Sequence, residues 1–173
     1  MADGRRPGRE TMTLIIDGYN LLHASGVFGS ERGPRAFEAS RRALLSLLVD
    51  LLGEARSDAI VVFDAANAPD GLPARFVHEG ITVLFAREYP DADSLIEKLV
   101  AEDQAPGHLV VVSSDRRLQV AARRRRARAV SCETWLAEAR AARQRRAAGR
   151  VAEKPPAPGP EGIDFWKDYF GLS

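Results

Sequence analysis

Four short apolar runs, separated mostly by helical patterns, constrain the fold of this chain more than any other feature. The runs lie at 13–17, 59–63, 81–85 and 109–113. Runs of this length, rich in Val and Ile, are typical of strands that are buried on both faces of a parallel sheet. Apolar residues at helical spacing are found at roughly 35–53, 91–103 and 115–124. This alternation predicts an α/β fold with a mostly parallel central sheet of about five strands.

The segments between these runs complete the prediction. Residues 127–131 form a weaker fifth strand pattern, and residues 133–148 have the pattern of a final helix. The glycine-rich segment 21–33 is predicted to be a loop over the carboxyl edge of the sheet, and therefore a candidate lid or substrate loop. Residues 65–79 contain a Pro-Asp-Gly turn signal and no long helical pattern.

An aspartate stands at or soon after the end of each of the four apolar runs. These residues are Asp17, Asp64, Asp93 and Asp115. Because parallel strands end at one edge of the sheet, where the next helices begin, we expect the four carboxylates to converge there. Four carboxylates cannot all stay ionised side by side without a cation. The pattern therefore predicts a divalent metal site, and oxygen-only ligands favour Mg²⁺ or Mn²⁺ over zinc.

Each acid also has a structural interpretation. Asp17 can cap the turn that follows its strand, and Asp115 stands where a helix N-cap is expected. Asp64 can accept a hydrogen bond from the turn that follows it. Asp91 fits an N-cap, whereas Asp93 lies in the first turn of the same predicted helix, where the helix dipole favours an ionised carboxylate.

Neutral polar side chains accompany the acids and are candidates for substrate binding. Asn20 offers an amide oxygen to a metal or an amide N–H to a phosphate, although it can also cap its own turn. Ser113 and Ser114 bring two hydroxyls to the end of a strand, where they can contact phosphate or metal-bound water. Ser114 can also cap the following helix.

Charge is strongly segregated along the chain, although the net charge is only +1. Residues 1–115 carry 11 Lys or Arg against 18 Asp or Glu, whereas residues 116–150 carry 12 against 2. We interpret the basic segment as a phosphate-binding arm beside an acidic site, and the alternative is a solvated helix surface. The candidate substrate-binding residues in this segment are Arg116, Arg117, Arg123, Arg124, Arg125, Arg126 and Arg128.

The whole chain predicts one domain with flexible ends. We expect a disordered segment at 1–12, a folded domain at 13–148, a Pro/Gly-rich linker at 149–162 and an aromatic tail at 163–173. The tail either docks on its own domain or binds a protein partner through its 163–170 stretch. No apolar run approaches the roughly 20 residues that span a bilayer, there is no signal-peptide pattern, and Cys132 is the only cysteine. These features predict a cytoplasmic protein without membrane association.

Four motifs carry a resemblance to a known family. They are IDGYNLLH at 16–23, VVFDA at 61–65, ADSLIEKL at 92–99 and VVSSD at 111–115. In this order, the motifs resemble those of the YacP-like branch of the NYN-domain family, within the PIN-like nuclease superfamily. The resemblance covers roughly 14–136, and the Pro-rich linker and the aromatic tail lie outside it.

The resemblance implies a three-layer α/β PIN-like fold and metal-dependent endoribonuclease activity on mRNA, with some members of the family acting on translating ribosomes. It implies that Asp17, Asp93 and Asp115 are metal ligands and catalytic residues, and that Asp64 and Asn20 complete the site. Two alternatives stay open. One is a non-catalytic RNA- or ribosome-binding adaptor with the same fold. The other is a metal-dependent phosphatase or phosphotransferase. This alternative is weaker, because Asp17 lacks the second aspartate two residues later that a phosphoaspartyl enzyme would have.

Overall fold

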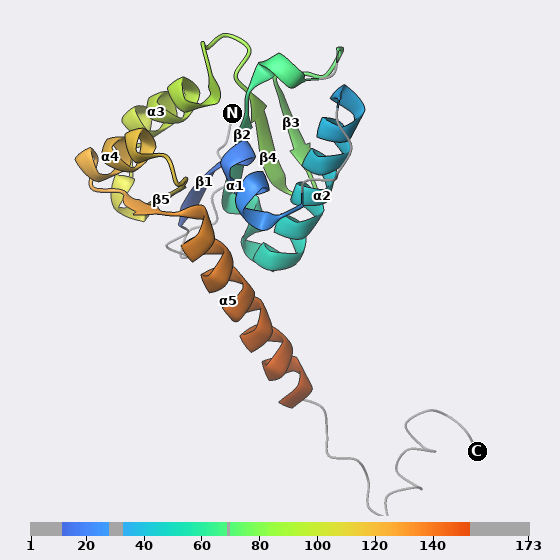
Figure 1. Cartoon of the computed structure of the whole chain (residues 1–173). Helices are drawn as coiled ribbons and strands as arrows, with labels where there is room; N and C mark the ends of the chain where they lie inside the picture. Colours follow the sequence, from blue (N-terminus) through green and yellow to red (C-terminus); the bar gives the residue numbers. More distant parts are fainter. Residues whose placement is uncertain (1–11, 28–32, 69, 153–173) are drawn as a thin grey trace, which may run out of the picture.

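A six-stranded sheet forms the centre of the molecule (Figure 1). The strands are β1 (Thr13–Asp17), β2 (Ala59–Phe63), β3 (Arg75–His78), β4 (Ile81–Phe85), β5 (Leu109–Val112) and β6 (Arg128–Val130). In this computed structural model, which describes residues 12–27, 33–68 and 70–152, the strand order is β3-β4-β2-β1-β5-β6. Among the described strands, β3 is antiparallel to its neighbour β4 and the other pairs are parallel.

Five α-helices of the described residues cover the two faces of the sheet. They are α1 (Gly18–Ser25), α2 (Pro34–Leu52), α3 (Ala92–Glu102), α4 (Arg116–Arg124) and α5 (Cys132–Ala152), with short 3-10 helices at Gly53–Asp58, Ala65–Asn67 and Pro106–His108. Helices α1, α2 and α5 pack on one face, and α3 and α4 pack on the other. The result is a three-layer α/β arrangement.

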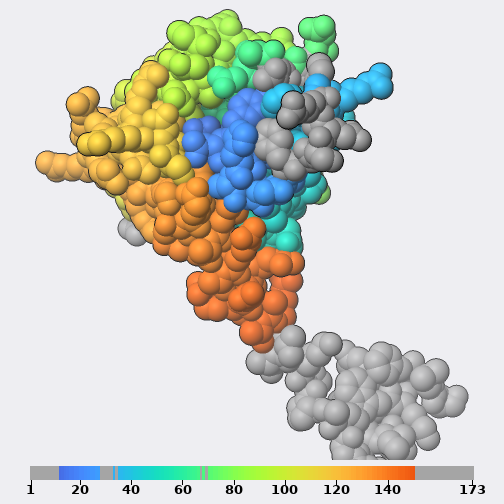
Figure 2. Space-filling model, viewed as in Figure 1, coloured from blue at the N-terminus to red at the C-terminus, as the bar shows by residue number. Residues whose placement is uncertain are grey.

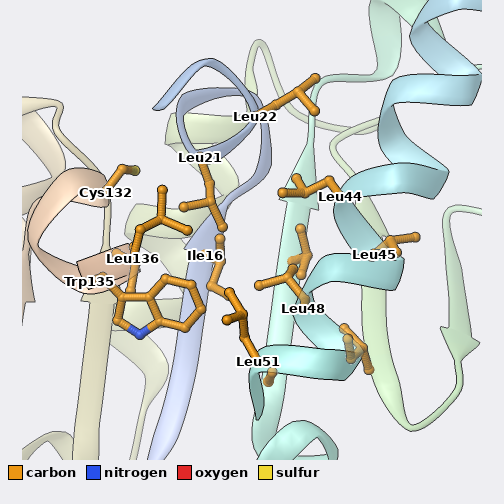
Figure 3. Packing of buried hydrophobic residues seen from close by; sticks show 14 of the residues in the cluster. Ile16, Leu21, Leu22, Leu44, Leu45, Leu48, Leu51, Cys132, Trp135 and Leu136 are labelled. Atoms are coloured by element: carbon orange, nitrogen blue, oxygen red, sulfur yellow. The ribbon is translucent and has the colours of Figure 1, made fainter. Parts of the chain in front are cut away.

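Strand β1 is buried on both of its faces. Figure 3 shows Ile16 of β1 among Leu21 of α1, Leu48 of α2 and Leu136 of α5. The preceding residue, Ile15, belongs to the cluster formed with α3 and α4. Because successive residues of a strand point to opposite faces, burial on both sides requires the continuous apolar run seen in the sequence.

The mostly parallel α/β fold is confirmed, and one more strand is present than the five predicted. Strand β3 lies at the edge of the sheet and alternates between exposed and half-buried residues, so it has no continuous apolar run. A tight turn at Glu79 and Gly80, with φ of 45° and 96°, joins it to β4. Two-residue turns with positive φ at both positions favour antiparallel hairpins.

The predicted loop at 21–33 is wrong in its first part, because α1 covers Gly18–Ser25. Asp17 caps this helix, and Gly26 ends it with φ of 71°. Two turns are too short to give a clear helical periodicity, and Gly, Tyr and Asn are poor helix formers. Residues 28–32, the centre of the proposed lid, lie outside the described residues.

Helix α5 runs to Ala152, so the first four residues of the linker predicted at 149–162 are helical. Gly149 does not end the helix, since a single glycine in a helix interior costs only about 1 kcal/mol. The remainder of the linker, the aromatic tail at 163–173 and residues 1–11 lie outside the described residues. Within the described ranges, none of the helices combines the length and the apolar content that crossing a membrane requires.

Candidate active site

All four predicted aspartates lie at the carboxyl edge of the sheet. Asp17 ends β1, and Asp64 directly follows β2, the neighbouring strand. Asp115 is the N-cap of α4, beyond the end of β5 on the other side of β1. Asp93 lies in the first turn of α3. The charges of Asp64 and Asp115 act on Asp17, and those of Asp17 and Asp115 act on Asp93, so the four carboxylates form one electrostatic group.

Asp17 is the most buried of the four, with 7% of its surface exposed. Burial raises the pKa of its carboxyl, hydrogen bonds from Ser113 and Asn20 oppose this, and the charges of Asp64 and Asp115 raise the pKa further. Its Oδ2 accepts a hydrogen bond from Ser113 Oγ at 3.0 Å, and its Oδ1 accepts one from Asn20 N at 3.4 Å. Both oxygens are therefore held in place.

Asp93 has the most unfavourable environment for a negative charge. Burial raises the pKa of its carboxyl to about 6, together with the charges of Asp17 and Asp115 and the hydrogen bond that a protonated Asp93 shares with Asp115. The charge of Asp91 adds to the effect. A bound cation would favour the ionised form of a carboxyl whose pKa is raised by burial and by acidic neighbours.

Three of the acids also anchor the start of a helix. Asp17 caps α1, and Asp115 Oδ1 accepts a hydrogen bond from Arg117 N at 2.7 Å. Asp64 Oδ1 accepts one from Ala92 N at 2.6 Å, and so contacts the start of α3 rather than its own following turn. These structural roles do not exclude ligation, because each carboxylate has two oxygens and about four lone-pair sites.

The donor set suits a hard divalent cation, but it does not form a closed coordination sphere. Carboxylate oxygens are the ligands that Mg²⁺ and Mn²⁺ prefer. Among the described residues, no three His, Cys, Asp or Glu side chains are arranged so that they could hold a metal ion as they stand. The metal site stays a prediction.

Asn20, Ser113 and Ser114 connect the end of β1 to the end of β5. Asn20 Oδ1 accepts hydrogen bonds from Ser114 N at 3.0 Å and from Cys132 Sγ at 3.2 Å. Ser114 Oγ donates to Glu133 at 2.9 Å. Cys132 is a contact that the sequence pattern did not reveal, because its partner is 112 positions away. These bonds show how the edge is held together, and contact with a substrate stays a prediction.

Gly18 and Tyr19 of the first motif have packing roles. A Cβ at Gly18 would lie 2.4 Å from the ring of Phe63, so the position requires glycine for a close approach. The Tyr19 ring contacts Phe63 edge-on, with centroids 5.5 Å apart. The interpretation of Tyr19 as a packing residue is confirmed.

The first two arginines of the basic segment differ in their contacts. Arg117 donates to Glu97 through Nε at 2.8 Å and through Nη2 at 2.7 Å, and its Nη1 lies 3.8 Å from Asp91. It therefore links α4 to α3. Arg116 is exposed, and its side chain makes no hydrogen bond or ion pair with the described residues, so it is the better candidate for a phosphate near the acids.

The other arginines do not lie at the acidic edge. Helix α4 begins next to Asp115 and carries Arg123 and Arg124 in its last turn, and nine residues of helix span about 13 Å. Arg128 starts β6 and is paired with Val110, near the amino end of β5. The expected arm beside the site, comprising Arg123, Arg124, Arg125, Arg126 and Arg128, thus lies at the opposite edge of the sheet.

Comparisons with known proteins agree with this fold. The family model of the YacP-like NYN domain matches residues 14–157. The YacP protein of Bacillus subtilis (strain 168), which carries the description uncharacterized, is 31% identical over 86 residues. That alignment covers 50% of this chain and 49% of the relative, so it spans about half of the relative's length.

Two crystal structures of Rae1 (YacP) from Bacillus subtilis are similar to this chain. One superposes with a TM-score of 0.62 at 27% identity and covers 92% of this chain and 91% of the other. The second, of a mutant form of the same protein, has the same TM-score and identity and covers 82% of each chain. The NYN domain is a PIN-like, nuclease-type fold. This chain therefore belongs to the YacP-like NYN domain family.

Proposed function

We propose that this chain is a metal-dependent endoribonuclease that hydrolyses phosphodiester bonds of RNA. The observation that supports the proposal is the convergence of Asp17, Asp64, Asp93 and Asp115 on one sheet edge, with the pKa of Asp93 raised to about 6. Membership of a family with a nuclease-type fold supports the reaction class. Within this proposal the substrate is mRNA, and action on ribosome-bound mRNA is an extension that needs its own test.

Asp17, Asp93 and Asp115 would hold the Mg²⁺ or Mn²⁺, and Asp64 and Asn20 would complete the site. The cation would supply an acidified water and neutralise charge that develops on the phosphate and the leaving oxygen. A histidine base is then not required, which suits a chain with three scattered histidines.

The side chains around the acids orient them. Ser113 Oγ donates to Asp17 Oδ2 and accepts from Asp115 N, both at 3.0 Å, so one buried hydroxyl sets two of the aspartates relative to each other. The ion pair between Arg117 and Glu97 joins the start of α4, which Asp115 caps, to the second turn of α3, one turn beyond Asp93. Such positioning of charged groups before reaction is a large part of electrostatic catalysis.

The test is cleavage of a labelled single-stranded RNA by the purified full chain in Mn²⁺, in Mg²⁺ and in EDTA. We expect cleavage with a metal, none in EDTA, and a loss of at least about 100-fold in kcat/KM for Asp17→Asn and Asp93→Asn. Asp58→Asn is the matched control, because Asp58 precedes β2 at the opposite edge of the sheet. Full activity in both edge variants would exclude the proposed site.

One observation favours a second candidate, an RNA- or ribosome-binding adaptor without cleavage. Asp17, Asp64 and Asp115 each already accept a backbone hydrogen bond at the start of a helix, so these acids have a structural reason to be present. The same assay separates the two functions. Chelator-insensitive binding without any cleavage in Mn²⁺ or Mg²⁺ would support the adaptor.

A further inference from the structure

A second charged surface lies near the amino ends of the parallel strands, opposite to the carboxyl ends where the four aspartates lie. We call it the basic surface and define it by Arg123, Arg124, Arg126, Arg128 and Arg145. The first four lie in the last turn of α4, in the turn after it and at the start of β6. Arg128 and Arg145 line one groove beside α5, so the surface continues from α4 to α5. In Figure 2 the yellow-to-orange α4–β6 segment projects from the left of the molecule, directly above the orange helix α5.

Most of these arginines have no structural role within the described part of the chain. Arg123, Arg124, Arg126 and Arg145 are exposed, and their side chains make no hydrogen bond or ion pair with the described residues. Arg128 pairs with Glu138 at 3.0 Å. The favourable interaction of a cation with a helix dipole is limited to the last turn of the helix. It can account for Arg123 and Arg124, but not for Arg126 or Arg145.

Three neighbouring arginines, in contrast, make contacts that hold elements of the fold together. Arg125 donates to the backbone oxygen of Asp103 at 2.8 Å, and Arg146 to that of Leu51 at 2.6 Å. Arg143 pairs with Asp50 at 2.9 Å. The chain therefore uses several arginines of this region to hold elements together, and leaves the side chains of Arg123, Arg124, Arg126 and Arg145 exposed to solvent.

The groove beside α5 suits a nucleic-acid backbone. Its volume is about 550 Å³, and its lining combines charged and apolar side chains, among them Arg128, Glu138, Arg145, Arg146, Leu51 and Trp135. Arg128 is paired with Glu138 and Arg146 with Leu51 O, so Arg145 is the cation of this lining whose side chain has no partner among the described residues. Guanidinium groups bind phosphate oxygens in a forked geometry, and apolar side chains can contact the sugars between phosphates. Charge complementarity thus favours a polyanion as the occupant.

We propose that the basic surface is an RNA-binding site separate from the cleavage edge, which holds the phosphate backbone without reading the sequence. The inference goes beyond the proposed nuclease activity, because binding here needs neither the metal nor the aspartates. About 13 Å of helix α4 separates the two edges. An RNA anchored on the basic surface therefore leaves the acidic edge free for another segment of the same or a different strand.

The test measures binding of a labelled single-stranded RNA to the full chain in EDTA, across a series of KCl concentrations. The variant carries Arg123→Gln, Arg124→Gln and Arg126→Gln, and its matched control carries Lys at the same three positions. We expect the Gln variant to bind at least about tenfold more weakly at low salt and to reduce the slope of log K against log salt by about 2. The Lys variant should stay close to wild type. An unchanged slope in the Gln variant, or an equal loss in the Lys variant, would overturn the proposal.

Three further variants keep the outcome decisive. Arg145→Gln changes the part of the basic surface that lies on α5. It should weaken RNA binding and reduce the slope of log K against log salt by about 0.7. This variant tests the proposal if the triple variant does not fold. Arg35→Gln with Arg75→Gln removes exposed charge elsewhere and should leave the slope unchanged. Asp17→Asn should bind RNA at least as tightly as wild type does, even if it cannot cleave. Binding by this variant thus separates failure of the anchoring site from failure of the nuclease assignment.

Discussion

At the scale of single residues, Asp93 shows how the proposed metal-binding role conflicts with the stability of the metal-free fold. Its pKa is raised to about 6 in the folded protein, above the ordinary value of 3.8. The folded state therefore binds this proton more tightly than the unfolded chain does. Without a cation, the contribution of Asp93 to stability is highest below about pH 4 and falls as the pH rises through about 6. We expect Asp93→Asn to raise the Tm of the metal-free protein at pH 7.5 and to change it little at pH 4.5.

Thermal unfolding in EDTA at the two pH values measures this difference. Asp58→Asn serves as the control, since Asp58 lies at the far edge of the sheet. The same Asp93→Asn protein should lose RNA cleavage, so that a gain in stability and a loss of activity come from one substitution. A Tm equal to that of wild type at both pH values would show that the acidic group does not destabilise the fold.

Ser113 is the residue whose hydroxyl most directly connects two aspartates. It is fully buried, donates to Asp17 and accepts from Asp115 N. Ser113→Ala leaves both groups short of a partner, which should cost about 1–3 kcal/mol of unfolding free energy. Because the change disorients two acids without removing them, we expect kcat to fall about 10–100-fold while KM changes little. Urea unfolding and initial rates on labelled RNA test this, and an unchanged kcat would assign Ser113 a purely structural role.

At the scale of elements, the contact between α3 and α4 sets the distance between Asp93 and Asp115. Arg117 of α4 and Glu97 of α3 make this contact at the surface, with about half and a third of their side chains exposed. An exposed pair of this kind is worth about 0–1 kcal/mol, so Glu97→Gln should change stability little. We expect it to lower kcat, because α3 and α4 are then held less firmly. Glu38→Gln breaks the similar Arg42–Glu38 pair on α2 and should leave kcat unchanged.

The elements also show which parts of the fold can be predicted from sequence. Strands β1, β2 and β5 follow from continuous apolar runs, since burial on both faces requires them. Strand β4 follows from a mostly apolar run in which every second residue is buried. Strand β3 and helix α1 do not, because one is a half-exposed edge strand and the other is two turns long. The common position of the four aspartates can be predicted from sequence, because the carboxyl ends of parallel strands lie at one edge of the sheet. The position of the arginines at 123–128 cannot be predicted from their closeness to Asp115 in sequence, because helix α4 carries them about 13 Å away from it.

At the scale of the whole molecule, the acidic edge and the basic surface lie at opposite ends of the sheet. The acidic and basic residues that are separated in the sequence are also separated in space, because α4 starts at the edge with the aspartates and ends at the opposite edge. An acidic edge repels RNA until a cation neutralises it, whereas the basic surface attracts RNA at once. The arrangement predicts that metal affects cleavage much more than it affects binding.

The charge of the acidic edge should also make the stability of the whole domain depend on metal. A cation that binds the folded state alone stabilises it by about 2.7 kcal/mol at 100 times its Kd, which corresponds to about 5–10 °C in Tm for a domain of this size. We expect Mn²⁺ to raise the Tm of wild type by this order and EDTA to reverse the change. Asp17→Asn and Asp93→Asn should respond weakly, because each removes a proposed ligand and part of the charge repulsion that the cation would relieve. An equal rise in both variants would mean that Mn²⁺ binds elsewhere, and the acidic edge would then have to be explained by helix capping alone.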